Sequence, residues 1–318
     1  MFWVKKICFL QINVIFLAHK NINDNNRNTM KPIADSELML NDDGSIFHLH
    51  LLPGEIAENI ILVGDQDRVD VVAKNFDTVE VTKQNREFRT ITGTKNGKRI
   101  SVVSTGIGTD NIDIVLTELD ALVNIDLKTR LIKPQHTTLN IVRIGTCGSL
   151  QPDIPTGTPV LTAIAGGLDG LLNFYADRDK VCDLELEAKF QQHTQRNPKL
   201  AVPYFVPSSP ELMKKLSKFR AGITLSAPGF YGPQGREVRL GITDKDINSK
   251  LESFEYKGMK INNYEMESSA INGLGQLLGH NTATVCLVIA NRRCLEFAPN
   301  YRSAMPDLVN DIVNILTQ

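Results

Sequence analysis

The sequence lacks the signatures of a disulfide-stabilised or zinc-binding protein. Its five cysteines are scattered along 318 residues, with no CxxC pair and no zinc-finger spacing. Its six histidines form no HExxH motif or other regular ligand pattern. Cysteines without a framework are typical of a reducing compartment, so we expect a cytoplasmic protein without a metal site.

A basic surface block is also missing. The chain carries 35 Lys and Arg against 36 Asp and Glu, for a formal net charge of −1. This balance argues against general binding to nucleic acid or to an anionic membrane. There is no Walker lysine motif, and "GIGTDN" (106–111) matches only part of GxGxxG, because Asn111 stands where the third glycine belongs. An NAD-dependent dehydrogenase is therefore an outside alternative, which a lack of nicotinamide binding would remove.

Residues 1–29 differ from the rest of the chain. "MFWVKKICFLQINVIFLAHK" resembles a signal peptide, but Gln11 and Asn13 interrupt its apolar run and no small-x-small cleavage site follows. The run is too short and too polar to span a bilayer. We expect residues 1–29 to be a disordered upstream extension, with a secretion signal as the alternative, and residues 30–318 to form a single domain.

From residue 59 onwards, apolar runs alternate with helical patterns. Strands are predicted at 59–64, 86–94, 98–106, 138–148, 157–167, 221–226 and 282–292. Helices are predicted at 68–76, 109–123, 184–195, 209–219, 265–279 and 305–317, the second of them with Thr109 or Asp110 as its N-cap. This alternation predicts an α/β fold with a central mixed β-sheet flanked by helices. The polar stretch 124–137 is interpreted as a solvated loop.

Three glycine-rich turns follow predicted strands: "GDQDRV" (64–69), "STGIGTDN" (104–111) and "RIGTCGS" (143–149). Ligands of α/β sheets gather at the carboxyl ends of strands, where free backbone N–H groups are available. Arg68 and Arg143 lie in two of these turns, and arginine beside free amides is typical of an oxyanion or phosphate site. The alternative for each arginine is a surface ion pair.

A loop rich in glycine and proline, "GFYGPQGRE" (229–237), combines three useful side chains. Phe230 offers an aromatic face, Gln234 an amide that both donates and accepts, and Arg236 a cation. Together these suit a planar heterocycle that carries carbonyl groups. The alternative is a surface loop with a packed aromatic ring.

The stretch "NNYEMESSAI" (262–271) places Glu265 and Glu267 on either side of a methionine, with apolar neighbours. Residues two apart share a face in a strand but diverge by about 200° in a helix. A buried carboxylate without a partner costs several kcal/mol, so it needs hydrogen-bond donors or a ligand. The alternative is a helix start with Asn263 as its N-cap and acidic residues in the first turn.

Taken in order, these motifs resemble the nucleoside phosphorylase family, and specifically its uridine phosphorylase branch. The matching segments are "FHLHL" (47–51), "GDQDRV", "REF" (86–88), "STGIG", "RIGTCGSLQPDI", "GFYGPQGRE", "NYEMESSA" and "IANR". They extend from about residue 44 to the C-terminus, and "FYGPQGR" separates the uracil branch from the purine one. The resemblance implies reversible phosphorolysis of uridine to uracil and ribose 1-phosphate, without an organic cofactor.

The resemblance also implies roles for individual residues. The phosphate ligands would be Gly64, Arg68, Arg86, Arg143 and Thr146. The ribose would be held by His48, Met266 and Glu267, and the base by Phe230, Gln234, Arg236 and Arg292. Arg143, Glu267, Gln234 and Arg236 would carry catalysis, with Glu265 as a supporting partner of Glu267. His48, at the 5′-hydroxyl, and Arg86 would act in a neighbouring subunit's site, which implies at least a dimer and, by the resemblance, a hexamer.

The chain departs from the family pattern at three positions near the site. Gln66 replaces a proline of the first turn, and Cys147 stands where threonine is common. Some relatives bind a monovalent cation near Glu87, but Asn111 replaces a serine there, so this ion is not predicted.

The alternatives to a uridine phosphorylase are a purine nucleoside phosphorylase, a nucleosidase that uses water, or a non-catalytic nucleoside-binding protein. Gln234 and Arg236 argue against purine, and the arginines Arg68, Arg86 and Arg143 argue against hydrolysis.

Overall fold

A computed structural model describes residues 31–318, so the predicted upstream extension 1–29 lies outside the described residues. The strands are β1 (Asn59–Val63), β2 (Thr78–Asn85), β3 (Phe88–Lys95), β4 (Lys98–Ser104), β5 (Ile125–Asp126), β6 (Leu131–Ile132), β7 (Asn140–Ser149), β8 (Pro159–Gly167), β9 (Tyr204–Pro207), β10 (Arg220–Ser226), β11 (Glu255–Tyr256), β12 (Met259–Glu265), β13 (Asn281–Asn291) and β14 (Glu296–Phe297). The helices are α2 (Gln66–Ala73), α3 (Thr109–Asn124), α4 (Leu184–Thr194), α5 (Pro210–Lys215), α6 (Ile247–Ser253), α7 (Ser268–Leu277) and α8 (Met305–Thr317). Within residues 31–318, no helix is long and apolar enough to cross a membrane.

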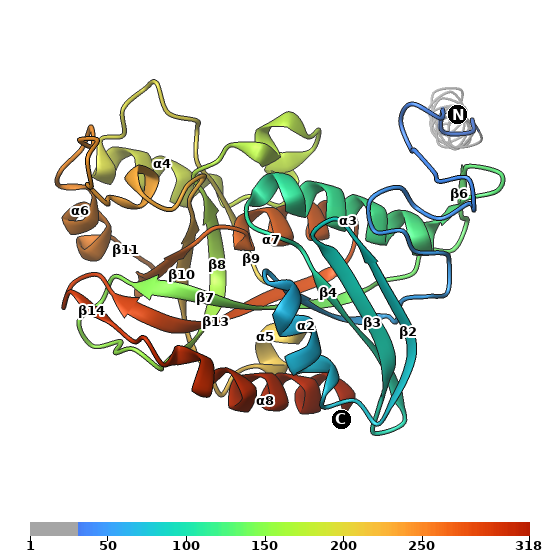
Figure 1. The fold of residues 1–318 in the computed structure, drawn as a ribbon. Helices are drawn as coiled ribbons and strands as arrows, with labels where there is room; N and C mark the ends of the chain where they lie inside the picture. Colours follow the sequence, from blue (N-terminus) through green and yellow to red (C-terminus); the bar gives the residue numbers. More distant parts are fainter. Residues whose placement is uncertain (1–30) are drawn as a thin grey trace, which may run out of the picture.

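Twelve strands form one mixed sheet in the order β11-β12-β10-β8-β13-β7-β1-β4-β3-β2, with β14 paired to β13 and β9 to β8 (Figure 1). The predicted α/β fold with a central mixed sheet is therefore confirmed. A further antiparallel pairing joins β12 to β7, with Tyr264 opposite Gly148. Strands β7, β12, β10, β8 and β13 consequently close into a ring. This closure places "NYEMES" directly beside "RIGTCGS".

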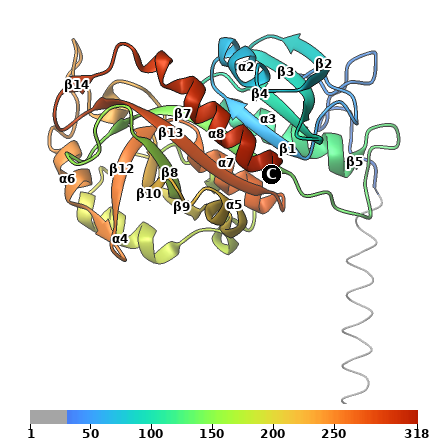
Figure 2. The same cartoon turned by 90° about the horizontal axis from the view of Figure 1, so that it is seen from below.

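The central strand β1 is apolar throughout because both of its faces are covered. Ile60 and Leu62 belong to the core beneath α3 and α7, whereas Ile61 and Val63 belong to the core beneath α2 and α8. Figure 2 shows α8 running across the face of the sheet opposite α3 and α7. Continuous apolar runs are expected for strands buried on both faces, which is why β1 could be recognised from sequence.

At two helix starts the structure differs from the local patterns, once from the alternative reading of 262–271 and once from a prediction. Asn263 is not an N-cap, because it lies in β12 and the helix α7 begins only at Ser268. Neither Thr109 nor Asp110 caps α3; the N-cap is Gly108, with φ of 102° and no capping side chain. Glycine adopts such a positive φ without the strain that a side chain would impose. The N–H of Gly108 is thereby free to bind another group.

The stretch 124–137 is more ordered than the predicted solvated loop. It contains the two-stranded hairpin β5–β6, and Leu127 is buried in the core beneath α3. Arg130 Nε donates a hydrogen bond of 2.7 Å to the carbonyl of Ile33. The interpretation as a solvated loop was therefore wrong for Leu127 and Arg130.

Candidate active site

A cavity of about 960 Å³ opens at the carboxyl ends of the central strands. Most of the side chains predicted for the site line it: Gly64, Arg68, Arg143, Thr146, Phe230, Gln234, Arg236, Met266, Glu267 and Arg292. These residues come from segments that are far apart in the chain. They meet because parallel strands end at the same edge of a sheet and because β12 pairs with β7.

Arg143 lies between two buried carboxylates. Its Nη2 contacts Oε2 of Glu267, and its Nη1 is 3.4 Å from Oε2 of Glu265. Burial alone would lower the pKa of Arg143, but the carboxylates of Glu267 and Glu265 raise it. The guanidinium folds back over Gly145, where an added Cβ would lie 1.9 Å from Nη1. A side chain at position 145 would therefore displace Arg143, which explains the first glycine of "RIGTCG".

Glu265 and Glu267 have different tasks. The carboxylate of Glu265 accepts hydrogen bonds from the backbone N–H of Glu267 (2.9 Å) and of Ser268 (3.0 Å), and from the hydroxyl of Ser226. It therefore caps the start of α7. Glu267 lines the cavity, and its Oε1 accepts the N–H of Gly108 at 2.8 Å. Both carboxylates are buried and partnered, as their cost of desolvation requires.

Arg68 provides a second cation on the same side of the cavity. Its Nη1 donates to the carbonyl of Ile144 at 3.2 Å, and it makes no ion pair with any residue between 31 and 318. Burial, followed by repulsion from Arg143, lowers its pKa. Two guanidinium groups that repel each other beside a cavity are stabilised when an anion binds between them. The geometry thus fits a phosphate site.

Another part of the cavity wall is formed by the loop predicted to bind a base. The guanidinium of Arg236 lies 3.8 Å from the centre of the Phe230 ring, and its Nη1 donates to Gln234 Oε1 at 2.7 Å. Burial, together with repulsion from Arg292, lowers the pKa of Arg236 to about 10. The loop therefore presents an aromatic ring, a buried amide and one cation to the cavity, and Arg292, which follows β13, adds a second cation.

His48 and Arg86 do not line this cavity. His48 is bound to Glu118 through a 2.6 Å contact between Nδ1 and Oε1, and Arg86 lies over the ring of Phe47 at 5.8 Å. The amide of Asn85 donates to the carbonyl of His48 at 2.8 Å, which ties the two segments together. The structure thus groups His48 and Arg86 with each other, apart from the site in their own chain.

Three contributors to the site were missed from sequence. The N–H of Gly108 binds Glu267, and Tyr264 lines the cavity with a hydroxyl that has no hydrogen-bond partner in the described chain. Tyr264 lies within "NYEMES", so that motif already contained the signal. Gln66 donates from Nε2 to the carbonyl of Arg86 at 2.8 Å, a contact between distant segments that no local pattern indicates.

Of the departures, Cys147 lines the cavity, whereas Asn111 lies beside Gly106, which lines it. Cys147 is buried on its wall, and burial, then a contact with Cys286, raises the pKa of its thiol. A neutral thiol is a weaker hydrogen-bond donor than the hydroxyl of threonine. A Cβ on Gly106 would meet both the amide of Asn111 and the side chain of Glu87, so these residues are neighbours.

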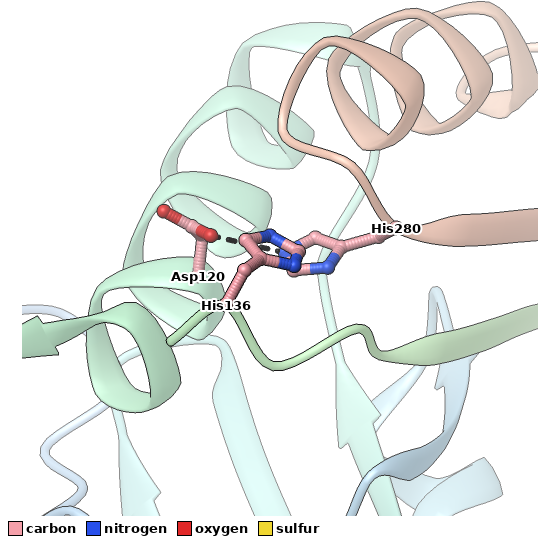
Figure 3. Close-up of side chains that lie close together, drawn as sticks. All are labelled: Asp120, His136 and His280. Carbon is pink, nitrogen blue, oxygen red and sulfur yellow. Dashed lines mark ion pairs between the residues drawn. The ribbon is translucent and has the colours of Figure 1, made fainter. Parts of the chain in front are cut away.

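One cluster away from the cavity contains typical metal-ligand types. Asp120, His136 and His280 converge where the 124–137 stretch meets α3 and the start of β13 (Figure 3). Nδ1 of His280 accepts the N–H of Leu139 at 3.2 Å, which leaves the ring proton on Nε2, 3.2 Å from Oδ1 of Asp120. A metal needs a ring nitrogen with a free lone pair, and His280 then has none. The hydrogen bonding favours a structural role.

The protein is an α/β protein with a mixed, partly closed sheet, and paired arginines and a buried carboxylate line one cavity at its strand ends. A family model described as "Phosphorylase superfamily" matches residues 58–313. The chain therefore belongs to the phosphorylase superfamily, as its motifs indicated, and has the nucleoside phosphorylase fold.

Named relatives agree with this assignment. Uridine phosphorylase of Thermococcus kodakarensis is 26% identical over 291 residues, covering 91% of this chain and 93% of that protein. A DeoD-type purine nucleoside phosphorylase of Bacillus velezensis is 30% identical over 155 residues, covering 47% of this chain and 61% of that protein. The solved Trypanosoma brucei nucleoside phosphorylase, described as showing uridine phosphorylase activity, matches with a TM-score of 0.75 at 26% identity, covering 87% of this chain and 99% of that one.

Proposed function

We propose that the protein catalyses the reversible phosphorolysis of uridine to uracil and ribose 1-phosphate. One observation carries this proposal: Arg68 and Arg143, Glu267, and the pair Gln234 and Arg236 all line the same cavity. A nucleoside phosphorylase needs sites for an anion, a sugar and a base next to one another, and this cavity supplies a chemically matched group for each.

The reaction follows from electrostatics. As the glycosidic bond breaks, positive charge grows on the sugar, and a carboxylate at the ribose stabilises it. Glu267 fits this role and also accepts hydrogen bonds from ribose hydroxyls. Phosphate is the nucleophile, so it must be positioned by Arg68, Arg143, Thr146 and the backbone of Gly64. No side-chain nucleophile and no organic cofactor are required.

The departing uracil takes up negative charge. Arg236 and Arg292 place two cations beside the amide of Gln234, and their mutual repulsion is relieved by an anionic base. Gln234 is buried, so its amide can recognise a carbonyl and a ring N–H of uracil together. This favours uridine over a purine nucleoside. The two arginines at the anion site favour phosphorolysis over hydrolysis, because water needs no such cations.

We infer further that the protein is a homo-oligomer with shared sites, at least a dimer and, following the resemblance, a hexamer. The support is that His48 and Arg86 lie outside the cavity of their own chain but next to each other. A cytoplasmic location is also proposed, and the four cysteines in residues 31–318, which are all free thiols, support a reducing compartment.

The experiment is a spectrophotometric screen of uridine, thymidine, inosine and adenosine, each with and without inorganic phosphate. We expect cleavage of uridine that depends on phosphate, with inosine and adenosine far slower. Cleavage without phosphate would identify a nucleosidase. Preferred cleavage of inosine would identify a purine enzyme, and binding without any cleavage would identify a nucleoside-binding protein.

A further inference from the structure

The carboxylate of Glu118, in the middle of α3, is directed at the segment that carries His48. Its oxygens accept hydrogen bonds from the backbone N–H of Leu49 (2.8 Å) and of His48 (3.0 Å), and from Nδ1 of the His48 ring (2.6 Å). Glu118 is 6% exposed, and no Lys or Arg in residues 31–318 pairs with it. Its buried charge is therefore balanced by these N–H groups.

These contacts determine the protonation pattern of the His48 ring. Because Nδ1 faces an acceptor-only carboxylate, it carries a hydrogen, and Nε2 is then the free acceptor of the neutral ring. The ring direction is also constrained, since it packs edge-on against Phe47 at 4.9 Å and against Phe88 at 6.3 Å between ring centres. About a fifth of the side chain, 20%, stays exposed, so Nε2 can be offered to a group outside the chain.

We propose that Glu118 is the positioning residue for His48, holding Nε2 as the acceptor for the 5′-hydroxyl of a nucleoside bound in a partner copy of this chain. The inference rests on the proposed function and adds a residue to it that no sequence motif indicated. Glu118 does not line the cavity, so it acts on the reaction only through His48.

A purely structural role makes a different prediction. If Glu118 only fastened residues 46–51 to α3, its loss would weaken the reaction of every nucleoside equally. A positioning role affects only substrates that possess a 5′-hydroxyl. The comparison of uridine with 5′-deoxyuridine separates the two, because these substrates share the base, the glycosidic bond and the 2′- and 3′-hydroxyls and differ only in the 5′-hydroxyl.

The test measures kcat/KM of wild type and Glu118→Gln for both substrates. Glutamine retains the size but has only one acceptor oxygen, so its NH2 group must face either the ring Nδ1–H of His48 or the backbone N–H of Leu49. We expect the uridine value to fall about five- to tenfold, the effect of one lost hydrogen bond between neutral groups, and the 5′-deoxyuridine value to stay within about twofold. His48→Phe is expected to show the same selectivity, and the double variant no further loss.

Glu187→Gln is the matched control, because Glu187 is also a buried glutamate but pairs with Arg178. Its uridine to 5′-deoxyuridine ratio is expected to equal that of wild type. An equal loss on both substrates in Glu118→Gln, or no loss, would overturn the positioning role while leaving the proposed function intact. A wild type that does not phosphorolyse uridine would instead overturn the proposed function.

A second measurement does not depend on the stability of the variant. Long-range ¹H–¹⁵N spectra of the wild-type protein report which ring nitrogen of His48 carries the hydrogen. We expect the Nδ1–H form at a pH where the ring is neutral. The Nε2–H form would contradict the proposal.

Discussion

Arg143 and Glu267 form an ion pair that is almost closed to solvent, with 5% and 3% of the two residues exposed. One partner is the predicted phosphate ligand and the other the predicted ribose ligand. The pair therefore joins the two halves of the proposed reaction centre, with the nucleophile on the side of the cation and the developing sugar cation on the side of the carboxylate. Such preorganised charges are an effective source of transition-state stabilisation.

Arg143 and Arg68 are expected to differ in their effects on stability. Arg143→Ala leaves the carboxylates of Glu267 and Glu265 buried and uncompensated, so we expect a loss of about 3–5 kcal/mol in the free energy of unfolding as well as of activity. Arg68→Ala removes a cation that has no acidic partner in the described chain, so stability should change little. Denaturant unfolding of both variants checks this. Equal stabilities would contradict the central position of Arg143 between the carboxylates.

Arg68→Ala should nevertheless lower activity by weakening the binding of phosphate. We expect KM for phosphate to rise about tenfold or more, in line with one charge-assisted hydrogen bond, with KM for uridine nearly unchanged. Steady-state kinetics with each substrate varied in turn provide the measurement. A rise in KM for uridine alone would contradict this role and would assign Arg68 to nucleoside binding instead of phosphate binding.

Gln234→Ala tests the recognition of the base. The side chain is buried, and its Oε1 accepts from Arg236 at 2.7 Å. Its loss should lower kcat/KM for uridine by about 1–3 kcal/mol of transition-state binding, because a buried polar contact is removed. Residual activity on inosine is the control and should change much less. If kcat/KM falls equally for uridine and inosine, Gln234 does not recognise the base.

Gln66 gives the chain a contact that the family's proline cannot make. Gln66 Nε2 donates to the carbonyl of Arg86, and Gln66 Oε1 accepts from Gln84 at 3.0 Å. Gln66 is also the first residue of α2, a position where proline is well tolerated. Gln66→Pro should therefore stay folded while kcat/KM for phosphate falls by several-fold, about 1 kcal/mol for the lost hydrogen bond.

Gln84→Ala is the matched control for Gln66→Pro, since it removes only the outer contact and leaves the bond to Arg86 in place. Phosphate kinetics of the two variants are compared side by side. If Gln84→Ala is as impaired as Gln66→Pro, the support of Arg86 is not what Gln66 provides.

The pH dependence of the reaction should reflect Glu267. Burial raises its pKa above the ordinary 4.5; Arg143 opposes this, and the neighbouring Glu265 adds to it. Glu267 works as a carboxylate, so activity should fall as pH decreases through that raised value. Stability has the opposite sign: the contribution of Glu267 is present below 4.5 and is lost as pH rises through the raised folded-state pKa.

The variant Glu265→Gln tests whether Glu267 is the group that titrates in the acid limb of the pH profile. Removing the negative charge of Glu265 should move the acid limb of the kcat/KM profile for uridine to lower pH. The ionisation of phosphate is the same for both enzymes, so the difference between the profiles belongs to the protein. An unchanged limb, or one shifted to higher pH, would rule out Glu267 as the titrating group.

The sequence predicted the central strands because they are buried on both faces, as the continuous apolar run of β1 illustrates. It did not predict β2, because only Val79 and Val81 alternate with polar residues there, and at this edge position even Val79 is exposed. It also misplaced the start of α7. The pairing of β12 with β7, between residues more than a hundred positions apart, keeps Asn263 extended, and a local capping rule cannot include that contact.

The site shows the same division. Arg68, Arg143, Gln234 and Glu267 were identified through turns and motifs, because each lies in a short segment with its own chemistry. The residues that hold site side chains in place were not identified. Gly108 binds Glu267 and Glu118 binds His48 through contacts between distant segments, and such contacts form only once the chain is folded.

The most direct test of the whole account is a crystal structure of the protein with uridine and sulfate. We predict the sulfate between Arg68 and Arg143, the ribose hydroxyls on Glu267, and the uracil ring on Gln234 and Arg236 in the same cavity. A sulfate and a nucleoside bound in separate places, or a ribose turned away from Glu267, would contradict it.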